Sequence, residues 1–148
     1  MTFDRYPTRV GATSMVYEFV SEGKKGAIPK LVVYSTTHLH NFFNLGFGDK
    51  DRVTGLIDDM VVTNNGDSEK VLATVASTLY AFTDQYPDAM VFVEGSNKAR
   101  TRLYRIGISN NIRMIEADFE VFGFLAENWQ VFEKQVAYEA FLVKRKKK

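Results

Sequence analysis

The chain has 148 residues, which suggests one domain, and 45% of them are hydrophobic, enough for a sizeable core. It contains no cysteine, which excludes disulfides, thiolate metal sites and cysteine nucleophiles. No apolar run approaches the ~20 residues of a membrane helix, and the N-terminal segment lacks the apolar stretch of a signal peptide. The sequence therefore predicts a soluble, cytoplasmic protein without a membrane partner.

Charge is unevenly distributed, although the formal net charge is +1. The last five residues, Lys144 to Lys148, are all basic, and subtracting their five charges leaves −4 for the rest. The body is therefore not the generally basic surface that binds nucleic acid. We expect a domain over residues 1–143 and a basic, solvated tail over residues 144–148; a nucleic-acid arm is the alternative.

The N-terminal half of the chain has the pattern of closely spaced strands. Four segments are rich in β-branched and aromatic residues and are separated by Gly, Asp and Asn turns: 15–20, 31–34, 41–47 and 57–63. Short connections between such segments favour an antiparallel meander.

The strongest helix pattern covers Ser68 to Gln85, where apolar residues recur at helical spacing and form one stripe. Asp67 precedes this segment and is a good N-cap residue. We expect its carboxylate to occupy the first backbone N–H groups of the helix.

The loop before this helix joins a strand to a helix N-terminus. Its backbone and side chains could receive a phosphate, so a weak cofactor-binding role falls to Asn64, Asn65, Gly66 and Ser68. Acidic residues at the start of the helix would oppose an anion there. A capped strand–helix turn is therefore the favoured interpretation.

A short apolar strand, Met90 to Val93, leads into a basic helix over residues 97–106 that contains no acidic residue. A strand that delivers its end to a basic helix N-terminus is a common way to build an anion site. We predict that this site uses Ser96, Asn97, Lys98, Arg100, Arg102 and Arg105. The alternative is internal, because arginines also pack their stems on apolar surface and pair with carboxylates of the same fold.

A helical projection of the basic segment places Ala99, Leu103 and Ile106 together, and we expect this face to pack on the core. Three cations share an adjacent face and repel one another until a partner neutralises them. That partner could be a phosphate on a small molecule, an acidic protein, a nucleic-acid backbone or the chain's own acidic stretch over residues 49–59.

The C-terminal part predicts a short helix over residues 109–116, a strand over 118–125, a turn before Trp129 and a final strand over 138–143. The fold class is therefore α+β. We expect one domain with a mostly antiparallel or mixed sheet in the order β-β-β-β-α-β-α-(α)-β-β, and helices that cover one face of it.

Other patterns are weaker. His38 and His40 could share a metal, but no third strong ligand adjoins them, and we predict no metal site. Trp129 and Phe132 would form a homodimer or partner patch if both were exposed; core packing is the alternative.

Three segments together resemble a family of small bacterial proteins of unknown function. They are GFGDKD (46–51), NNGDSEKVLATVA (64–76) and GSNKARTRLYR (95–105). The resemblance covers most of the chain. It implies a bacterial cytoplasmic protein and no particular activity.

The segment from Met90 to Ile108 also resembles the second half of the GNAT acetyltransferase fold, in which a strand leads to a helix that carries Asn and then Leu-Tyr. Asn97 and Leu103-Tyr104 fill those places. The resemblance implies Tyr104 as general acid toward the departing thiolate, with Asn97 near a CoA or acetyl-CoA cofactor. The glycine-rich pyrophosphate pattern of that fold is absent from residues 64–68.

Three functions stay open. The leading one is a non-enzymatic binding or interaction protein with an anion or acidic-partner site on the basic helix. An acyl-CoA-dependent N-acyltransferase requires a splayed cleft between the strand ending near Thr63 and the one ending near Val93, together with an accessible Tyr104. Nucleic-acid binding requires the basic helix and the tail on one surface.

Overall fold

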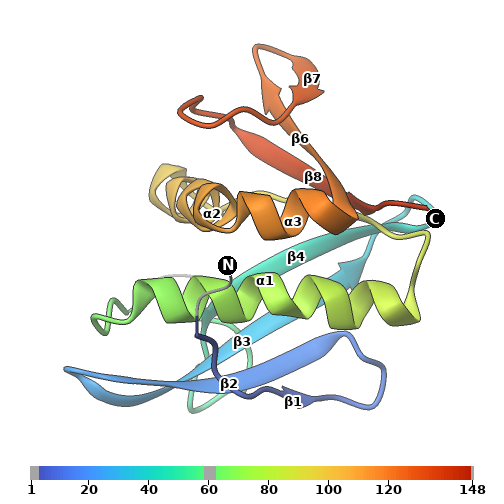
Figure 1. Cartoon of the computed structure of the whole chain (residues 1–148). Helices are drawn as coiled ribbons and strands as arrows, with labels where there is room; N and C mark the ends of the chain where they lie inside the picture. The colour runs from blue at the N-terminus through green and yellow to red at the C-terminus, as the bar shows by residue number, and fades with distance from the viewer. Residues whose placement is uncertain (1–3, 59–62, 148) are drawn as a thin grey trace.

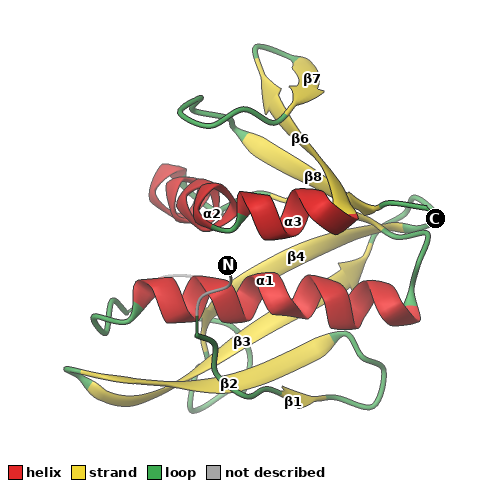
Figure 2. Cartoon of the chain, in the orientation of Figure 1, coloured by secondary structure: helices red, strands yellow, loops and turns green. Residues whose placement is uncertain are grey.

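The computed structural model describes residues 4–58 and 63–147. Within these residues, one eight-stranded mixed sheet carries three helices on one face (Figures 1 and 2). The single α+β domain expected from the sequence is confirmed. None of the three described helices combines the length and apolarity that crossing a membrane requires.

The elements follow one another as β1 (Arg9–Val10), β2 (Val16–Gly23), β3 (Gly26–Thr36), β4 (Phe42–Asp49), α1 (Ser68–Gln85), β5 (Met90–Val93), α2 (Lys98–Asn110), α3 (Ile112–Asp118), β6 (Phe119–Leu125), β7 (Asn128–Val131) and β8 (Ala140–Arg145). In the sheet the strand order is β1-β2-β3-β4-β5-β8-β6-β7. Strands β4 and β5 are parallel, and the other neighbours are antiparallel. The last strand, β8, thus inserts between β5 and β6.

The expected N-terminal meander is confirmed for β2, β3 and β4, but the strand expected over residues 57–63 is wrong within the described residues. Ile57 makes only an isolated bridge with Lys50, and residues 59–62 lie outside the described part. The sequence also did not predict β1 and β7. At the other end, β8 continues through Lys144 and Arg145, where the tail was expected to begin.

The loop after β4 turns back toward the strand because a side chain of the loop hydrogen bonds to the loop's own backbone. The Asp51 carboxylate accepts hydrogen bonds from the backbone N–H groups of Val53 and Thr54, at 2.8 and 3.0 Å, and these lower the pKa of Asp51. Ile57 then lies so close to Gly48 that a Cβ there would meet its Cγ2 at 2.8 Å. A residue with a side chain at position 48 would push the loop away.

The C-terminal end of α1 is closed by aromatic packing. Phe82 is fully buried, and its ring stacks on Tyr34 with 4.0 Å between centroids and meets Phe43 edge-on. The β8 residue Arg145 adds hydrogen bonds from its guanidinium to Thr83 and Asp84 of α1. The helix therefore ends against rings and an ion pair.

The parallel pair β4–β5 is short, and this creates an opening in the sheet. Four pairs, from Phe42↔Met90 to Leu45↔Val93, align the two strands. Strand β4 then continues to Asp49, and no described strand lies beside it on that side. The backbone of β4 past Leu45 is therefore available to side chains from the helices.

Candidate functional site

A cavity of about 570 Å³ lies between the N-terminal parts of α1 and α2, above the open edge of β4. We call it the α1–α2 cleft. Its walls come from α1 and the loop before it (Thr63, Asn64, Asn65, Asp67, Ser68, Val71, Leu72), from α2 (Asn97, Ala99, Arg100, Leu103, Ile106) and from the sheet (Lys30, Phe47).

The cleft brings together residues that the sequence assigned to two separate sites. From the loop before α1 it takes Asn64, Asn65 and Ser68, and from the basic helix it takes Asn97 and Arg100. The remaining predicted residues do not line it; they are Ser96, Lys98, Arg102, Arg105 and Gly66. The cleft therefore lies between the N-termini of two helices and is not formed by one face of the basic helix.

The first turn of α1 lacks the cap expected from the sequence. Asp67 is the N-cap residue, but its side chain makes no capping hydrogen bond to the described helix. Its carboxylate instead accepts hydrogen bonds from Tyr6 Oη at 2.5 Å and Ser21 Oγ at 2.6 Å. Burial and the bond to Asp67 raise the pKa of the Tyr6 hydroxyl. The expectation that Asp67 occupies the first N–H groups of α1 is therefore wrong, because two hydroxyls compete for it.

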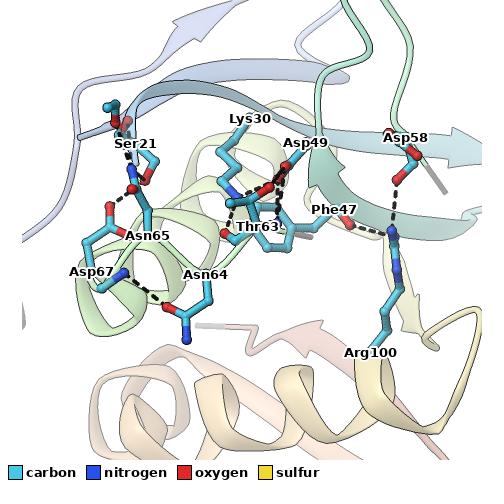
Figure 3. A network of polar contacts seen from close by, with 12 residues as sticks. Ser21, Lys30, Phe47, Asp49, Asp58, Thr63, Asn64, Asn65, Asp67 and Arg100 are labelled. Atoms are coloured by element: carbon cyan, nitrogen blue, oxygen red, sulfur yellow. Dashed lines mark hydrogen bonds and ion pairs between the residues drawn. The ribbon is translucent and has the colours of Figure 1, made fainter. Parts of the chain in front are cut away.

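Asn65 fixes the loop before α1 to the end of the β2–β3 hairpin (Figure 3). Its side chain is almost fully buried, with Oδ1 accepting from Lys25 N at 2.6 Å and Nδ2 donating to Gly26 O at 2.8 Å. Its backbone oxygen occupies the space that a Cβ at Gly23 would need. The hairpin therefore holds the N-terminus of α1 at the mouth of the cleft.

A buried ion pair forms the floor of the cleft beside this loop. Lys30 is 1% exposed, and its Nζ donates to the Asp49 carboxylate and, at 2.9 Å, to Thr63 O. Asp49 also accepts from Thr63 Oγ1 at 2.6 Å. Lys30 is not among the site residues predicted from the sequence. Its signal is the inward period-2 register of β3, in which Lys30 precedes the buried Val32.

Arg100 of α2 extends to the opening beside β4 (Figure 3), and Tyr104 of the same helix bonds to the β4 residue Phe47. Arg100 is buried and donates from Nη1 to Phe47 O at 3.3 Å and from Nη2 to Asp58 O at 2.8 Å. Tyr104 Oη accepts from Phe47 N at 3.0 Å. These two side chains replace a neighbouring strand as partners of Phe47.

The burial of Arg100 rotates α2 away from the expected orientation. The face expected to pack on the core is correct only for Leu103, which is half-buried against the core; Ala99 is exposed, and Ile106 is half-buried in the cleft wall. The buried face contains Arg100, Tyr104, Gly107 and Ile108. The guanidinium compensates for its burial by hydrogen bonding to the backbone carbonyls of Phe47 and Asp58.

The residues that the GNAT resemblance singled out have structural contacts here. Asn97 is the N-cap of α2, and its Oδ1 accepts from Arg100 N at 2.9 Å. The Tyr104 side chain is 6% exposed, and burial raises its pKa, partly offset by the bond with the Phe47 backbone.

A family model described as a family of unknown function, DUF6934, matches residues 2–146. The chain belongs to this family. No curated protein and no solved structure matches it. The DUF6934 chain must therefore be interpreted from its own geometry.

The other cations of the DUF6934 chain lie outside the cleft. Lys98 and Arg102 are exposed and Arg105 is half-buried, and none of the three forms an ion pair with a described residue. The tail contacts the C-terminal end of α1, where Lys147 pairs with Asp88 at 3.4 Å.

The weaker sequence patterns lie apart from this site. His38 and His40 are both exposed, and the described residues contain no group of three residues able to hold a metal. Trp129 is 43% exposed on β7, whereas Phe132 is 5% exposed in the core. Only one of the two aromatic residues is therefore available to a partner.

Proposed function

We propose that the chain is a binding protein whose α1–α2 cleft takes a small anionic molecule with an apolar portion. The observation that carries this proposal is the mixed lining of the cleft. Its polar part includes the start of α1 and the side chains of Asn64, Ser68 and Arg100. Its apolar part includes Val71, Leu72, Leu103 and Ile106.

The polar part of the cleft lining suits an anion for electrostatic reasons. The first backbone N–H groups of a helix carry a partial positive charge, and those of α1 are not occupied by the Asp67 carboxylate. The charge of Asp67 is held instead by Tyr6 and Ser21. Lys30 also lines this cavity, but its ammonium group is already paired with the Asp49 carboxylate.

A small molecule fits this arrangement better than an extended polyanion. The tail residues Arg145 and Lys147 pair at the C-terminal end of α1, whereas Lys98 begins α2 near the other end. Helix α1 has 18 residues and is about 27 Å long at 1.5 Å per residue. Lys98 and the tail therefore do not form one compact basic patch.

Thermal unfolding with added ligands tests the proposal at fixed ionic strength. The probes are inorganic pyrophosphate, acetyl-CoA and a long polyphosphate as polyanion control. A ligand at 100 times its Kd adds about 2.7 kcal/mol, which raises Tm by about 5–10 °C in a chain of this size. We expect at least one small anion to produce such a shift.

A matched pair of variants locates the binding. Ala99→Glu places a carboxylate in the cleft wall at an exposed helical position, and Lys98→Gln changes the net charge equally at the exposed neighbour. A repulsion of about 1 kcal/mol weakens binding about fivefold and removes about 2–4 °C of the ligand-induced shift in Ala99→Glu. Lys98→Gln should keep the shift of the wild type.

Two results would overturn the proposal. If no small anion raises Tm and only polyphosphate does, the exposed cations rather than the cleft bind anions. If Ala99→Glu and Lys98→Gln lose the same part of the shift, the binding follows net charge and not the cleft.

An acyl-CoA-dependent N-acyltransferase is the second proposal. The parallel pair β4–β5 that separates after Leu45↔Val93 favours it, as does the element order after β4. Tyr104 would have to leave Phe47 N in order to protonate a thiolate. Release of CoA thiol from acetyl-CoA with a mixed set of amine acceptors, lost in Tyr104→Phe, would support this function; binding of acetyl-CoA without any turnover would contradict it.

A further inference from the structure

A second, smaller cavity lies behind the α1–α2 cleft. Its volume is about 40 Å³, and it lies between α1, the α2–α3 segment and strands β4, β5 and β8. Its walls are apolar apart from the Tyr104 hydroxyl, which is bonded to Phe47. A cavity of this kind stays dry and accepts apolar groups.

The two cavities lie along the same stripe of α1. Ser68, Val71 and Leu72 border the cleft, and Leu72, Val75 and Ala76 border the inner cavity. Residues three and four apart lie on one face of a helix, so these side chains form a continuous line. Ala76 lies about 12 Å beyond Ser68 along the helix axis.

One contact separates the cleft from the inner cavity. Leu72 borders both, and it packs against Gly107 of α2 so closely that a Cβ there would lie 3.0 Å from Leu72 Cδ2. Glycine at position 107 allows this close packing of Leu72 on α2. A different rotamer of Leu72 would join the cleft to the inner cavity without moving either helix.

We infer that the ligand of the cleft is amphipathic: its anionic head lies at the start of α1, and an alkyl or acyl chain passes Leu72 so that its end fills the inner cavity. This inference rests on the proposed function, because the head must first bind in the cleft. An octyl chain spans about 9 Å and, together with its phosphate ester linkage, about the 12 Å from Ser68 to Ala76. Phosphate and carboxylate heads share this chemistry.

Titration calorimetry with n-alkyl phosphates tests the inference. The probes are methyl, butyl and octyl phosphate below their micellar concentrations, with 1-octanol as the same tail without a charged head. Burying each methylene is worth about fourfold in affinity. We expect octyl phosphate to bind at least 100-fold more tightly than methyl phosphate, and 1-octanol to bind far more weakly than octyl phosphate.

Filling the inner cavity should remove the gain in affinity that the longer alkyl chain provides. Ala76→Val adds two methyl groups to its wall, and Ala81→Val makes the same change at an exposed position of α1. We expect Ala76→Val to weaken octyl phosphate at least tenfold and to leave methyl phosphate unchanged, and Ala81→Val to change neither. If Ala76→Val does not fold, Gly107→Ala presses on Leu72 and takes its place.

The outcomes separate this inference from the proposed function. If no alkyl phosphate binds, or if 1-octanol binds as well as octyl phosphate, the anionic site itself is absent. If the phosphates bind with affinities independent of chain length, or if Ala76→Val and Ala81→Val bind octyl phosphate equally, the anion site stands and the chain-binding cavity is wrong.

Discussion

The two ends of α1 are built from different kinds of interaction. At its C-terminal end, the rings of Phe82 and Tyr34 stack with 4.0 Å between their centroids, and an ion pair of Arg145 with Asp84 lies beside them. At its N-terminal end, hydrogen bonds of Asn65 and Asp67 hold the loop, and a cavity of about 570 Å³ remains beside it. The first end contributes stability through apolar burial, and the second provides positioned polar groups with space for a ligand.

This difference has a physical reason in the sheet. Phe47 pairs with Val32 of β3, but the short pairing of β4 with β5 leaves it without a described strand neighbour on the other side. Polar side chains from α2 therefore bond to its backbone there. The opening in the sheet and the cavity above it therefore belong together.

The largest effect that we expect is at the closed end. Phe82→Ala removes a fully buried ring and should lower the free energy of unfolding by about 3–5 kcal/mol. Leu103→Ala, in the half-buried wall of the cleft, should cost about 1 kcal/mol. Urea denaturation measures both, and equal losses would show that the two ends contribute alike.

The buried ion pair under the cleft should give the next largest effect. Lys30→Met leaves the Asp49 carboxylate buried without its cation and should cost about 3 kcal/mol. The double variant Lys30→Met/Asp49→Leu should recover at least half of this loss, because no unpaired charge remains. If the double variant is no more stable than Lys30→Met in urea denaturation, the unpaired Asp49 carboxylate is not the cause of the lost stability.

Alkaline pH should weaken the closed end through Tyr17. Burial raises the pKa of Tyr17 to about 12 in the folded state, whereas the unfolded value is 10.0. The neutral hydroxyl is favoured by folding, so its contribution is complete below pH 10 and is lost as the pH rises toward 12. At pH 11 the loss is about 1.4 kcal/mol relative to pH 8.

Tyr17→Phe removes this titration. The variant should therefore lose about 1.4 kcal/mol less than the wild type between pH 8 and pH 11, as measured by urea unfolding at the two pH values. An identical loss in both proteins would place the alkaline sensitivity elsewhere.

Two buried tyrosines give the smallest effects, of opposite sign, at neutral pH. Tyr104→Phe removes the acceptor of the Phe47 N–H group and should cost about 1–2 kcal/mol. Tyr17 Oη is buried without a hydrogen-bond partner among the described residues, so Tyr17→Phe should be neutral or stabilising. Melting temperatures of the two variants measure this, and a lower Tm for Tyr17→Phe would reveal a partner for that hydroxyl.

The sequence predicted those parts of the fold that depend on apolar periodicity. Helix α1 has the predicted bounds, Ser68 to Gln85, because its apolar stripe continues over five turns. Strand β5 also matches, since four apolar residues between turns admit few alternatives. The α+β class follows from these elements and from the short turns between β2, β3 and β4.

The sequence predicted the site less well, because its polar residues hydrogen bond to residues that are distant in the chain. A helical projection treats Arg100 as a surface residue, yet Phe47 and Asp58 supply carbonyls that bury it. Local capping rules assign Asp67 to α1, yet Tyr6 and Ser21 bind its carboxylate. Such pairings depend on where the sheet ends, which no local pattern contains.

Backbone amide chemical shifts, followed by NMR during a titration with octyl phosphate, test the central claim most directly. We expect the largest changes at Ser68 and Glu69, where the head binds, and at Ala76 and Gly107 along the chain. Changes confined to the exposed cations of α2 or to the tail, with none at Ser68, would contradict a ligand site in the α1–α2 cleft.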